Sequence, residues 1–418
     1  MQTFLALVLL LPLQIAPDGA SVRSLVRELD APQKAVRDAA EQKLIELGPA
    51  VLEMLPRLKQ NDSAELALRL DRIRLALLRV RAAANLHGAK VTLAVKDKPL
   101  AEVLAEIERQ TDDKLLDYRR QFGQQSDDIP VTLDVRDLPF WETVDRLGEV
   151  TGLEPYHFAH EEGLALIART AASPSISAYV RYDGAFRVQA KKLTISRSLV
   201  AANSDLQIEL EAAWEPRLRP LFITVRMAKF TAVDDADQTI APSNPDAVLE
   251  IPPQGRASKV DVKLSFVAPP RSVRTVKSLR GTFDVLLPAE MHTFRFEQLG
   301  EREKQEQRAA AATVTLDSSK TGNGRVEATL RLRYDRPANA LESHRAWFYK
   351  NPAFLEGPDG AKIPPGTIEL IRQADDELTL RLLFPAPDDV SRHVLVYQTP
   401  ADLVALPVEF EFRDLPLP

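Results

Sequence analysis

The stretch VTLAVKDKPL at residues 91–100 returns forty residues later as VTLDVRDLPF at residues 131–140. Alternate residues of each copy are apolar, which is the pattern of a β-strand with one buried face. Asp97 and Pro99 end this pattern in the first copy, and the same residue types follow at the matching positions of the second. A proline suits the first turn of a helix, because its φ is already helical and its missing N–H would have no partner there. Each copy therefore predicts a strand, a break and a helix.

The residues after each proline repeat with the period of an amphipathic helix. The apolar stripe consists of Leu100, Val103, Leu104 and Ile107 in the first copy and of Phe140, Val144 and Leu147 in the second. About seven buried apolar side chains per copy would contribute roughly 10–20 kcal/mol. Ordering about 27 residues costs roughly 1–2 kcal/mol per residue for the backbone alone. One copy cannot fold by itself, so we expect the two copies to share one core.

Together with GLALIA at residues 163–168, the two copies resemble the short N-terminal domain that secretins and TonB-dependent receptors share. The resemblance covers residues 89–170. It implies a small α+β module in the bacterial periplasm that binds other proteins, and it brings no catalytic residues with it. The rest of the chain departs from both family contexts, so pore and transport functions are not expected.

Helical patterns and an export signal are expected before this module. Residues 21–88 carry apolar stripes at helical spacing and resemble a degenerate HEAT-type helical repeat. The run FLALVLLLPL at residues 4–13 has the length of the apolar region of a signal peptide and is too short to span a bilayer. We expect residues 1–20 to direct export to the periplasm or the cell exterior, with no membrane span in the mature chain. The alternative is that residues 4–13 form a buried first helix.

The composition limits the possible partners. The chain has 418 residues, a formal net charge of −6 and no cysteine. Nucleic acid is not an expected partner, because binding phosphates needs clustered Lys and Arg that this balance does not supply. Disulfides, thiolate metal sites and a cysteine nucleophile are excluded.

Residues 171–418 consist of short alternating or apolar runs separated by Pro, Gly, Asn and Asp. This spacing predicts two β-sandwiches, at 171–300 and 313–418, with the charged, Ala-rich stretch 301–312 between them as a linker or short helix. The expected fold class is multidomain α+β: N-terminal helical hairpins, a duplicated β-α-β module and two mostly antiparallel, Ig-like sandwiches.

Few residues suggest chemistry. The sequence contains no nucleophile elbow, Walker loop, GxGxxG or H-E-x-x-H motif. DDAD at 234–237 could offer oxygen ligands to Ca²⁺, but a hairpin turn explains it better. His157 and His160 lie three apart on an expected strand, which sends them to opposite faces. Four Asp doublets are typical of turns: they lie at 112–113, 127–128, 375–376 and 388–389. We expect no catalytic residue, cofactor or metal site.

Trp141 is the first candidate for a partner contact, provided that it is exposed, because it lies beside Phe140 and off the main helix stripe. These patterns favour an exported, non-enzymatic protein that binds other envelope proteins or itself. A second hypothesis is an accessory carbohydrate-active or hydrolytic protein with a site on sandwich loops. A third is assembly of a surface layer through the sandwiches.

Overall fold

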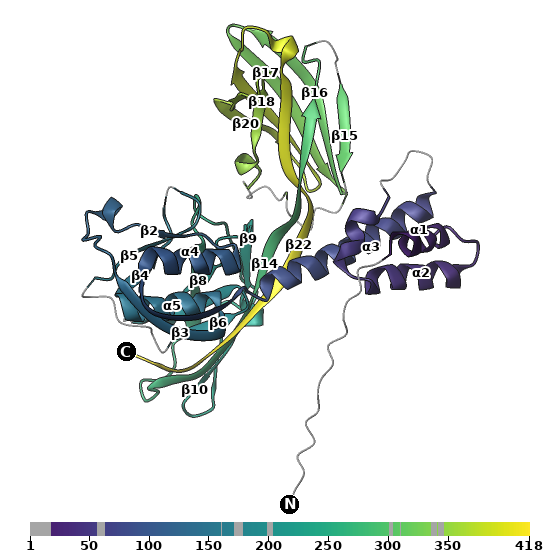
Figure 1. The fold of residues 1–418 in the computed structure, drawn as a ribbon. Helices are drawn as coiled ribbons and strands as arrows, with labels where there is room; N and C mark the ends of the chain where they lie inside the picture. Colours follow the sequence, from purple (N-terminus) through teal and green to yellow (C-terminus); the bar gives the residue numbers. More distant parts are fainter. Residues whose placement is uncertain are drawn as a thin grey trace, which may run out of the picture. The chain divides into compact units, whose positions relative to one another are not determined.

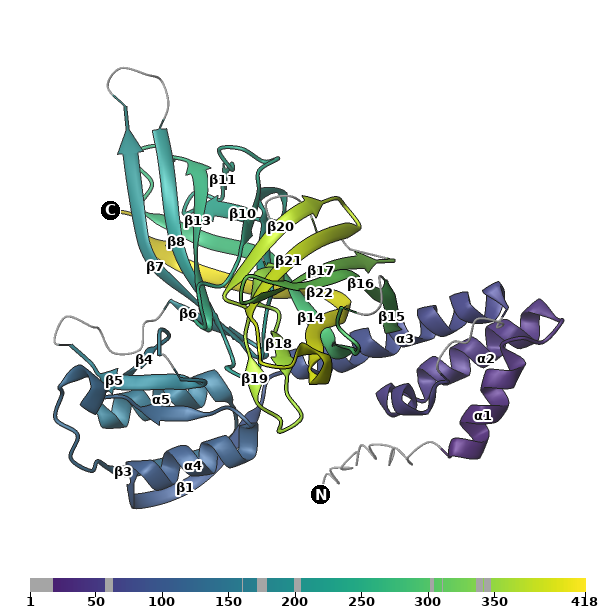
Figure 2. The same cartoon turned by 90° about the horizontal axis from the view of Figure 1, so that it is seen from above.

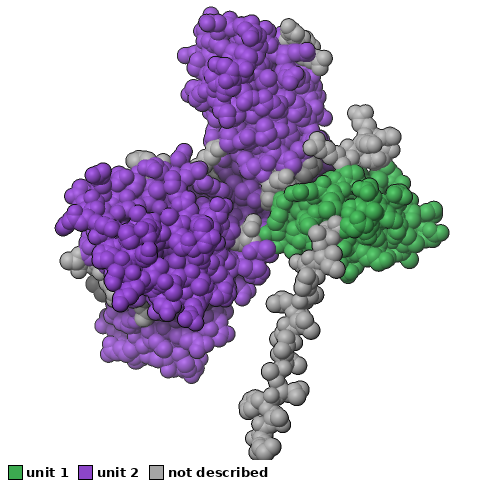
Figure 3. All heavy atoms as spheres, viewed as in Figure 1, with its two compact units in different colours: residues 1–81 green, residues 82–418 purple. Residues whose placement is uncertain are grey.

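The computed structural model describes residues 18–56, 63–159, 161–170, 179–198, 204–300, 304–309, 311–335, 341 and 347–418 (Figures 1 and 2). These residues form an α+β protein with N-terminal helices, two β-α-β units and several antiparallel sheets, as the sequence predicts. The chain divides into two compact units, residues 1–81 and residues 82–418 (Figure 3).

The first unit is helical. Its elements are α1 (Gly19–Glu28), α2 (Lys34–Glu46), the 3-10 helix η1 (Pro49–Met54) and the greater part of α3 (Ala64–Leu86). The side chain of Asp18 caps α1 by accepting hydrogen bonds from the N–H groups of Ala20 and Ser21. The apolar stripes form one small core with Val22, Leu44, Val51 and Ile73 fully buried. Most of the expected signal segment lies outside the described residues, and no described helix is long and apolar enough to cross a membrane.

The repeated phrase builds one α+β module at the start of the second unit. Its elements are β1 (Lys90–Pro99), α4 (Leu100–Thr111), β2 (Leu115–Asp117), the 3-10 helix η2 (Arg120–Phe122), β3 (Pro130–Pro139), α5 (Phe140–Thr151), β4 (Leu153–Tyr156) and β5 (Leu164–Ala168). Strands β1 and β3 pair with each other, and β2, β5 and β4 form a three-stranded sheet. Apolar residues from both helices and both sheets share a single core, so the two copies do complete each other.

The structure corrects the expected break at Asp97. The strand continues to Pro99 through a bulge, in which Asp97 and its counterpart Asp137 have φ values of 51° and 50°. The N–H of Asp97 donates to Thr132 Oγ1 and the N–H of Asp137 donates to Thr92 Oγ1, each at 3.0 Å. Each copy thus satisfies the bulged backbone of the other.

The first sandwich packs a four-stranded sheet against part of an eight-stranded one. The four-stranded sheet contains β6 (Val180–Asp183), β7 (Phe186–Arg197), β8 (Ser204–Trp214) and β13 (Lys259–Val267). The eight-stranded sheet contains β9 (Phe222–Arg226), β10 (Thr231–Asp234), β11 (Thr239–Ile240), β12 (Val248–Ile251), β14 (Thr275–Phe296), β18 (Ala353–Glu356), β19 (Lys362–Ile363) and β22 (Val394–Pro416). A 3-10 turn, η3 (Met227–Lys229), separates β9 from β10.

The second sandwich covers the remaining part of the eight-stranded sheet with a five-stranded one. The five strands are β15 (Gln305–Ala309), β16 (Ala312–Gly322), β17 (Arg325–Tyr334), β20 (Thr367–Gln373) and β21 (Glu377–Pro385). Two 3-10 turns, η4 (Trp347–Lys350) and η5 (Val390–Arg392), complete this region. Residues 305–309 are therefore a strand and not the expected linker or helix.

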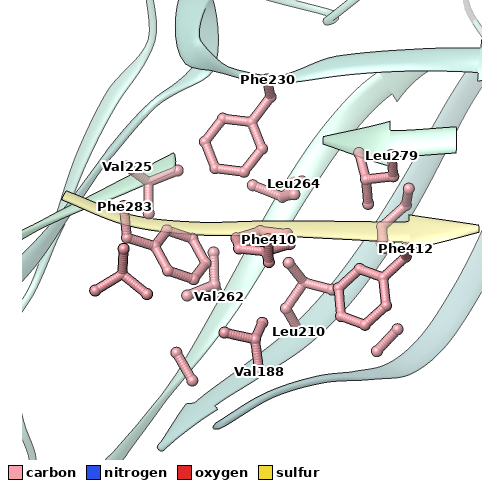
Figure 4. Close-up of a cluster of buried hydrophobic side chains, with 14 of the residues drawn as sticks. Val188, Leu210, Val225, Phe230, Val262, Leu264, Leu279, Phe283, Phe410 and Phe412 are labelled. Carbon is pink, nitrogen blue, oxygen red and sulfur yellow. The ribbon is translucent and has the colours of Figure 1, made fainter. Parts of the chain in front are cut away.

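Two long strands run through both sandwiches. β14 and β22 pair over almost their whole lengths, from Thr275 opposite Pro416 to Phe296 opposite Leu395 (Figure 1). Phe410 and Phe412, near the C-terminus, lie in the first core with side chains of β7, β8 and β13 (Figure 4). Phe296, by contrast, lies in the second core. The sequence predicts that each sandwich is one continuous segment. In the structure the two sandwiches instead share the strands β14 and β22.

Candidate functional site

The second unit contains a cleft of about 790 Å³ where loops of the module and of both sandwiches meet. The module provides the β4–β5 turn, and the first sandwich provides the β8–β9 and β12–β13 connections. The 3-10 turn η4 and the crossing segments of β14 and β22 complete the wall. Ligand sites occur preferentially at such domain junctions.

The lining is apolar and unusually rich in proline. Its apolar side chains are Trp214, Leu218, Leu221, Phe222, Met291 and Trp347, and its seven prolines are Pro216, Pro220, Pro252, Pro253, Pro288, Pro352 and Pro400. Trp214 and Trp347 are only 2% and 6% exposed. They pack below the surface and offer little open ring face, whereas Met291 is 47% exposed and reaches solvent.

Backbone hydrogen-bond donors are scarce in this lining. Prolines have no N–H group, and six other lining residues donate theirs to backbone carbonyls: Trp214, Leu218, Leu221, Ala257, Asn351 and Gln398. The side-chain amide of Asn351 donates to Tyr397 and Thr399, and that of Gln398 donates to Thr293. A ligand rich in acceptors, such as a phosphate ester, would therefore find its donors mainly in the guanidinium groups of Arg219 and Arg256 and not in the backbone.

Charged side chains at the cleft are mainly acidic. Glu161, Glu162 and Glu250 line it, together with Arg219 and Arg256. Arg219 Nη2 lies 3.1 Å from Glu162 Oε1, so one charge of each sign is already paired within the protein. The lining carries three carboxylates against two guanidinium groups and favours a ligand with positive charge.

Behind the cleft, a buried interface joins the module to the first sandwich. Trp141 is 1% exposed, and its Nε1 donates to the carbonyl of Ala185 at 3.2 Å. Its ring lies 5.9 Å from that of His157, and His157 Nδ1 lies 3.0 Å from Ser258 Oγ. The partner-contact hypothesis for Trp141 depended on exposure, which this structure does not provide: its ring is covered by the chain itself.

Charged groups in the same interface pair with one another. Asp145 accepts hydrogen bonds from Arg187 Nε at 2.8 Å and from the Tyr182 hydroxyl at 2.6 Å. Burial, together with the nearby Asp145 carboxylate, raises the pKa of Tyr182. Burial also lowers the pKa of His157 to about 4, so its imidazole is neutral near pH 7. These groups hold the module against the sandwich and do not form a set that faces a substrate.

A second group contains two carboxyls and one arginine. Asp113 and Glu215 are fully buried, and Arg217 lies between them with Nε 3.5 Å from Asp113 Oδ2 and 2.7 Å from Glu215 Oε2. The N–H of Arg217 donates to Asp113 and that of Ala89 donates to Glu215. Burial raises the pKa of both carboxyls, that of Asp113 to about 7, because removal from water disfavours their charged forms.

The other acidic candidates lie apart from the cleft. Asp234 accepts the N–H groups of Ala236 and Gln238, which makes DDAD a hairpin turn between β10 and β11. Asp112 ends α4 with φ 60°, and Asp389 caps η5 through Ser391. His160 lies outside the described residues. Among those that are described, no three His, Cys, Asp or Glu side chains are grouped to hold a metal ion.

Sequence reasoning missed the cleft. Its walls come from segments between residues 161 and 400, and their meeting depends on the pairing of β14 with β22. The one local signal is the run of prolines in the connections 216–220 and 252–253, which stiffens them but does not say where they meet. Comparisons of the chain with protein-family models, curated proteins and solved structures find no match.

Proposed function

We propose that the chain is an exported, non-enzymatic protein that binds another protein in the bacterial cell envelope through the cleft of its second unit. The observation that carries the proposal is the lining, which is apolar, proline-rich and poor in backbone donors, with three carboxylates and two guanidinium groups among its side chains. Such a surface suits contact with a polypeptide. The buried titratable groups nearest to it already pair with one another across the module interface.

Two further features support a binding role. The apolar run at residues 4–13 is typical of export, and residues 89–170 resemble a domain that binds proteins in the periplasm. Both remain proposals for this chain. They also agree with the absence of any recognisable catalytic motif in the sequence.

A hydrolytic or carbohydrate-active role is the alternative, since Glu161, Glu162 and Glu250 line the same cleft as two tryptophans. The burial of Trp214 and Trp347 argues against sugar stacking, and the Asp doublets lie in separate turns. Hydrolysis of a model glycoside or ester that is lost in a Glu161→Gln, Glu162→Gln variant would favour this alternative.

Cell fractionation followed by affinity capture from the envelope tests the proposal. The full chain should be found in the envelope fraction and should retain a protein that a Met291→Lys variant does not. Met291 is half exposed, so this variant changes the cleft without disturbing a core. Recovery from the cytoplasm alone, or equal capture by both proteins, would overturn the proposal.

A further inference from the structure

One strand at the cleft has an uncovered edge. β12 pairs antiparallel with β9 and with no other described strand. Val248 and Leu249 in this strand are 53% and 41% exposed. Neighbouring side chains of a strand point to opposite faces, so both faces of β12 are about half exposed at these residues.

The edge strand β12 is short, at four residues, and its first two residues carry none of the charges or prolines that protect many edge strands. Natural edge strands avoid pairing with other chains through Lys, Pro or inward-pointing charges. Here two aliphatic residues come first, and Pro252 follows after the last strand residue, Ile251. Edge strands of this kind accept an added strand from a partner.

The same strand leads directly into the cleft. Glu250 belongs to β12, and the residues that follow it, Pro252 and Pro253, line the cleft wall. A segment that paired with β12 and continued past Ile251 would reach the cleft wall at these prolines. Glu161 lies at the same lining, where Glu162 is already paired with Arg219, so the Glu161 carboxylate favours positive charge on that segment.

We propose that β12 and the cleft together bind an extended segment of a partner protein, added as an antiparallel or parallel strand, in which basic side chains alternate with apolar ones. The main chain of the segment pairs with the open edge of β12, and its side chains contact the apolar lining and the carboxylates. This inference rests on the proposed function and names the chemistry of the partner.

A synthetic peptide tests this chemistry directly. The probe is a fluorescein-labelled, end-blocked decapeptide of alternating Arg and Val with one central Phe, titrated against the full chain by fluorescence anisotropy. Two control peptides separate the contributions of charge and of strand pairing. One has Glu in place of every Arg, and the other has every backbone amide N-methylated, so that neither of its edges can donate to a β-ladder. Saturable binding of the probe is expected, with each control peptide at least tenfold weaker.

Variants of the chain locate the binding. Leu249→Lys at the strand edge and Met291→Lys in the cleft should each lower the affinity for the probe about fivefold or more. The pair Glu161→Gln, Glu162→Gln should weaken it about threefold to tenfold, in line with exposed charge pairs. Val267→Lys is the matched control, because Val267 is 50% exposed at the end of edge strand β13 and does not line the cleft. It should change affinity less than twofold.

Several results would overturn the inference. If the acidic peptide binds as tightly as the probe, charge does not contribute to binding; if the N-methylated peptide does, strand pairing does not contribute. If Val267→Lys weakens binding of the probe as much as the cleft variants do, the probe binds elsewhere. Self-association that Leu249→Lys abolishes would make a second copy the occupant. If envelope capture depends on Met291 while the probe does not bind, the inference falls and the proposed function stands. If the probe binds as expected but no envelope protein is captured, the proposed function fails and the peptide chemistry stands.

Discussion

At the scale of single residues, Thr92 and Thr132 explain why the repeated sequence keeps the same residue types at matching positions. Each accepts the N–H of the bulged Asp in the other copy, at the same distance of 3.0 Å. Buried or bulged backbone groups need such partners. The repeated Thr and Asp therefore form the same contact twice, once in each direction between the two copies. The sequence shows the repeat but not that each Thr bonds to the Asp of the other copy.

Asp113 makes a pH-dependent prediction. Its pKa is raised to about 7 by burial, beside Glu215 and Arg217, whereas the unfolded value is about 4. Between these values the folded protein binds more protons than the unfolded chain, so this residue makes the free energy of unfolding fall as pH rises. His157, with its lowered pKa, acts in the opposite direction below about pH 6.5, so variant and parent must be compared at each pH.

We expect Asp113→Asn to remove that fall. Asparagine keeps an oxygen for the N–H of Arg217 and carries no charge. Relative to the parent, the variant should gain about 2–3 kcal/mol of unfolding free energy between pH 4.5 and pH 8, measured by urea unfolding. Asp112→Asn, at the exposed end of α4, is the control and should leave the slope unchanged. Parallel pH profiles for Asp113→Asn and the parent would refute this account of the carboxyl pair.

Gly184 makes a steric prediction. It has φ +54°, and a Cβ there would lie 1.7 Å from the carbonyl oxygen of Leu86. Gly324, in the β16–β17 turn, has φ +71°, but a Cβ there would meet no atom within 4 Å. Gly324→Ala should cost only the left-handed backbone term of about 1–2 kcal/mol, whereas Gly184→Ala should cost at least about 2 kcal/mol more. Thermal unfolding of the two variants measures the difference, and equal losses would contradict the packing described.

At the scale of elements, the sequence predicts those that depend on local residue patterns and does not predict those that depend on pairing with distant strands. The strand and helix pairs of the module follow from residue periodicity, because each is determined within about 20 residues of chain. The length of β22 cannot be predicted from residue periodicity. Pro400 and Pro407 would each indicate the end of a strand, but β22 continues through both, with irregular pairing near Pro400. A strand that tolerates proline does so because of its neighbours, and the β14 residues opposite Pro400 and Pro407 lie over a hundred residues away in the sequence.

The shared strands predict that the two sandwiches unfold together. Phe412 lies in the first core and Phe384 in the second, and both are buried. Each Phe→Ala change should cost about 3–5 kcal/mol. Because β14 and β22 belong to both cores, each variant should lower the same calorimetric transition. Two separate transitions, each shifted by one variant alone, would show that the strands do not couple the sandwiches.

At the scale of the whole molecule, the cleft exists only when three parts of the second unit fold together. The module contributes the β4–β5 turn, and its position depends on buried contacts such as Trp141 with Ala185 and Asp145 with Arg187. Residue patterns identify the parts but not this junction, since its lining comes from connections with no pattern of their own. The binding hypothesis could thus be predicted from the sequence, and its location could not.

Site-specific photo-crosslinking in living cells tests the binding claim most directly. A photoreactive amino acid replaces Met291 in the cleft or, in a matched control, Val267 at the end of β13; both positions are about half exposed. The account predicts a discrete protein adduct in the envelope fraction from position 291, which Leu249→Lys in the same chain reduces, and no such adduct from position 267. Adducts of equal yield at both positions, or none at position 291, would contradict it.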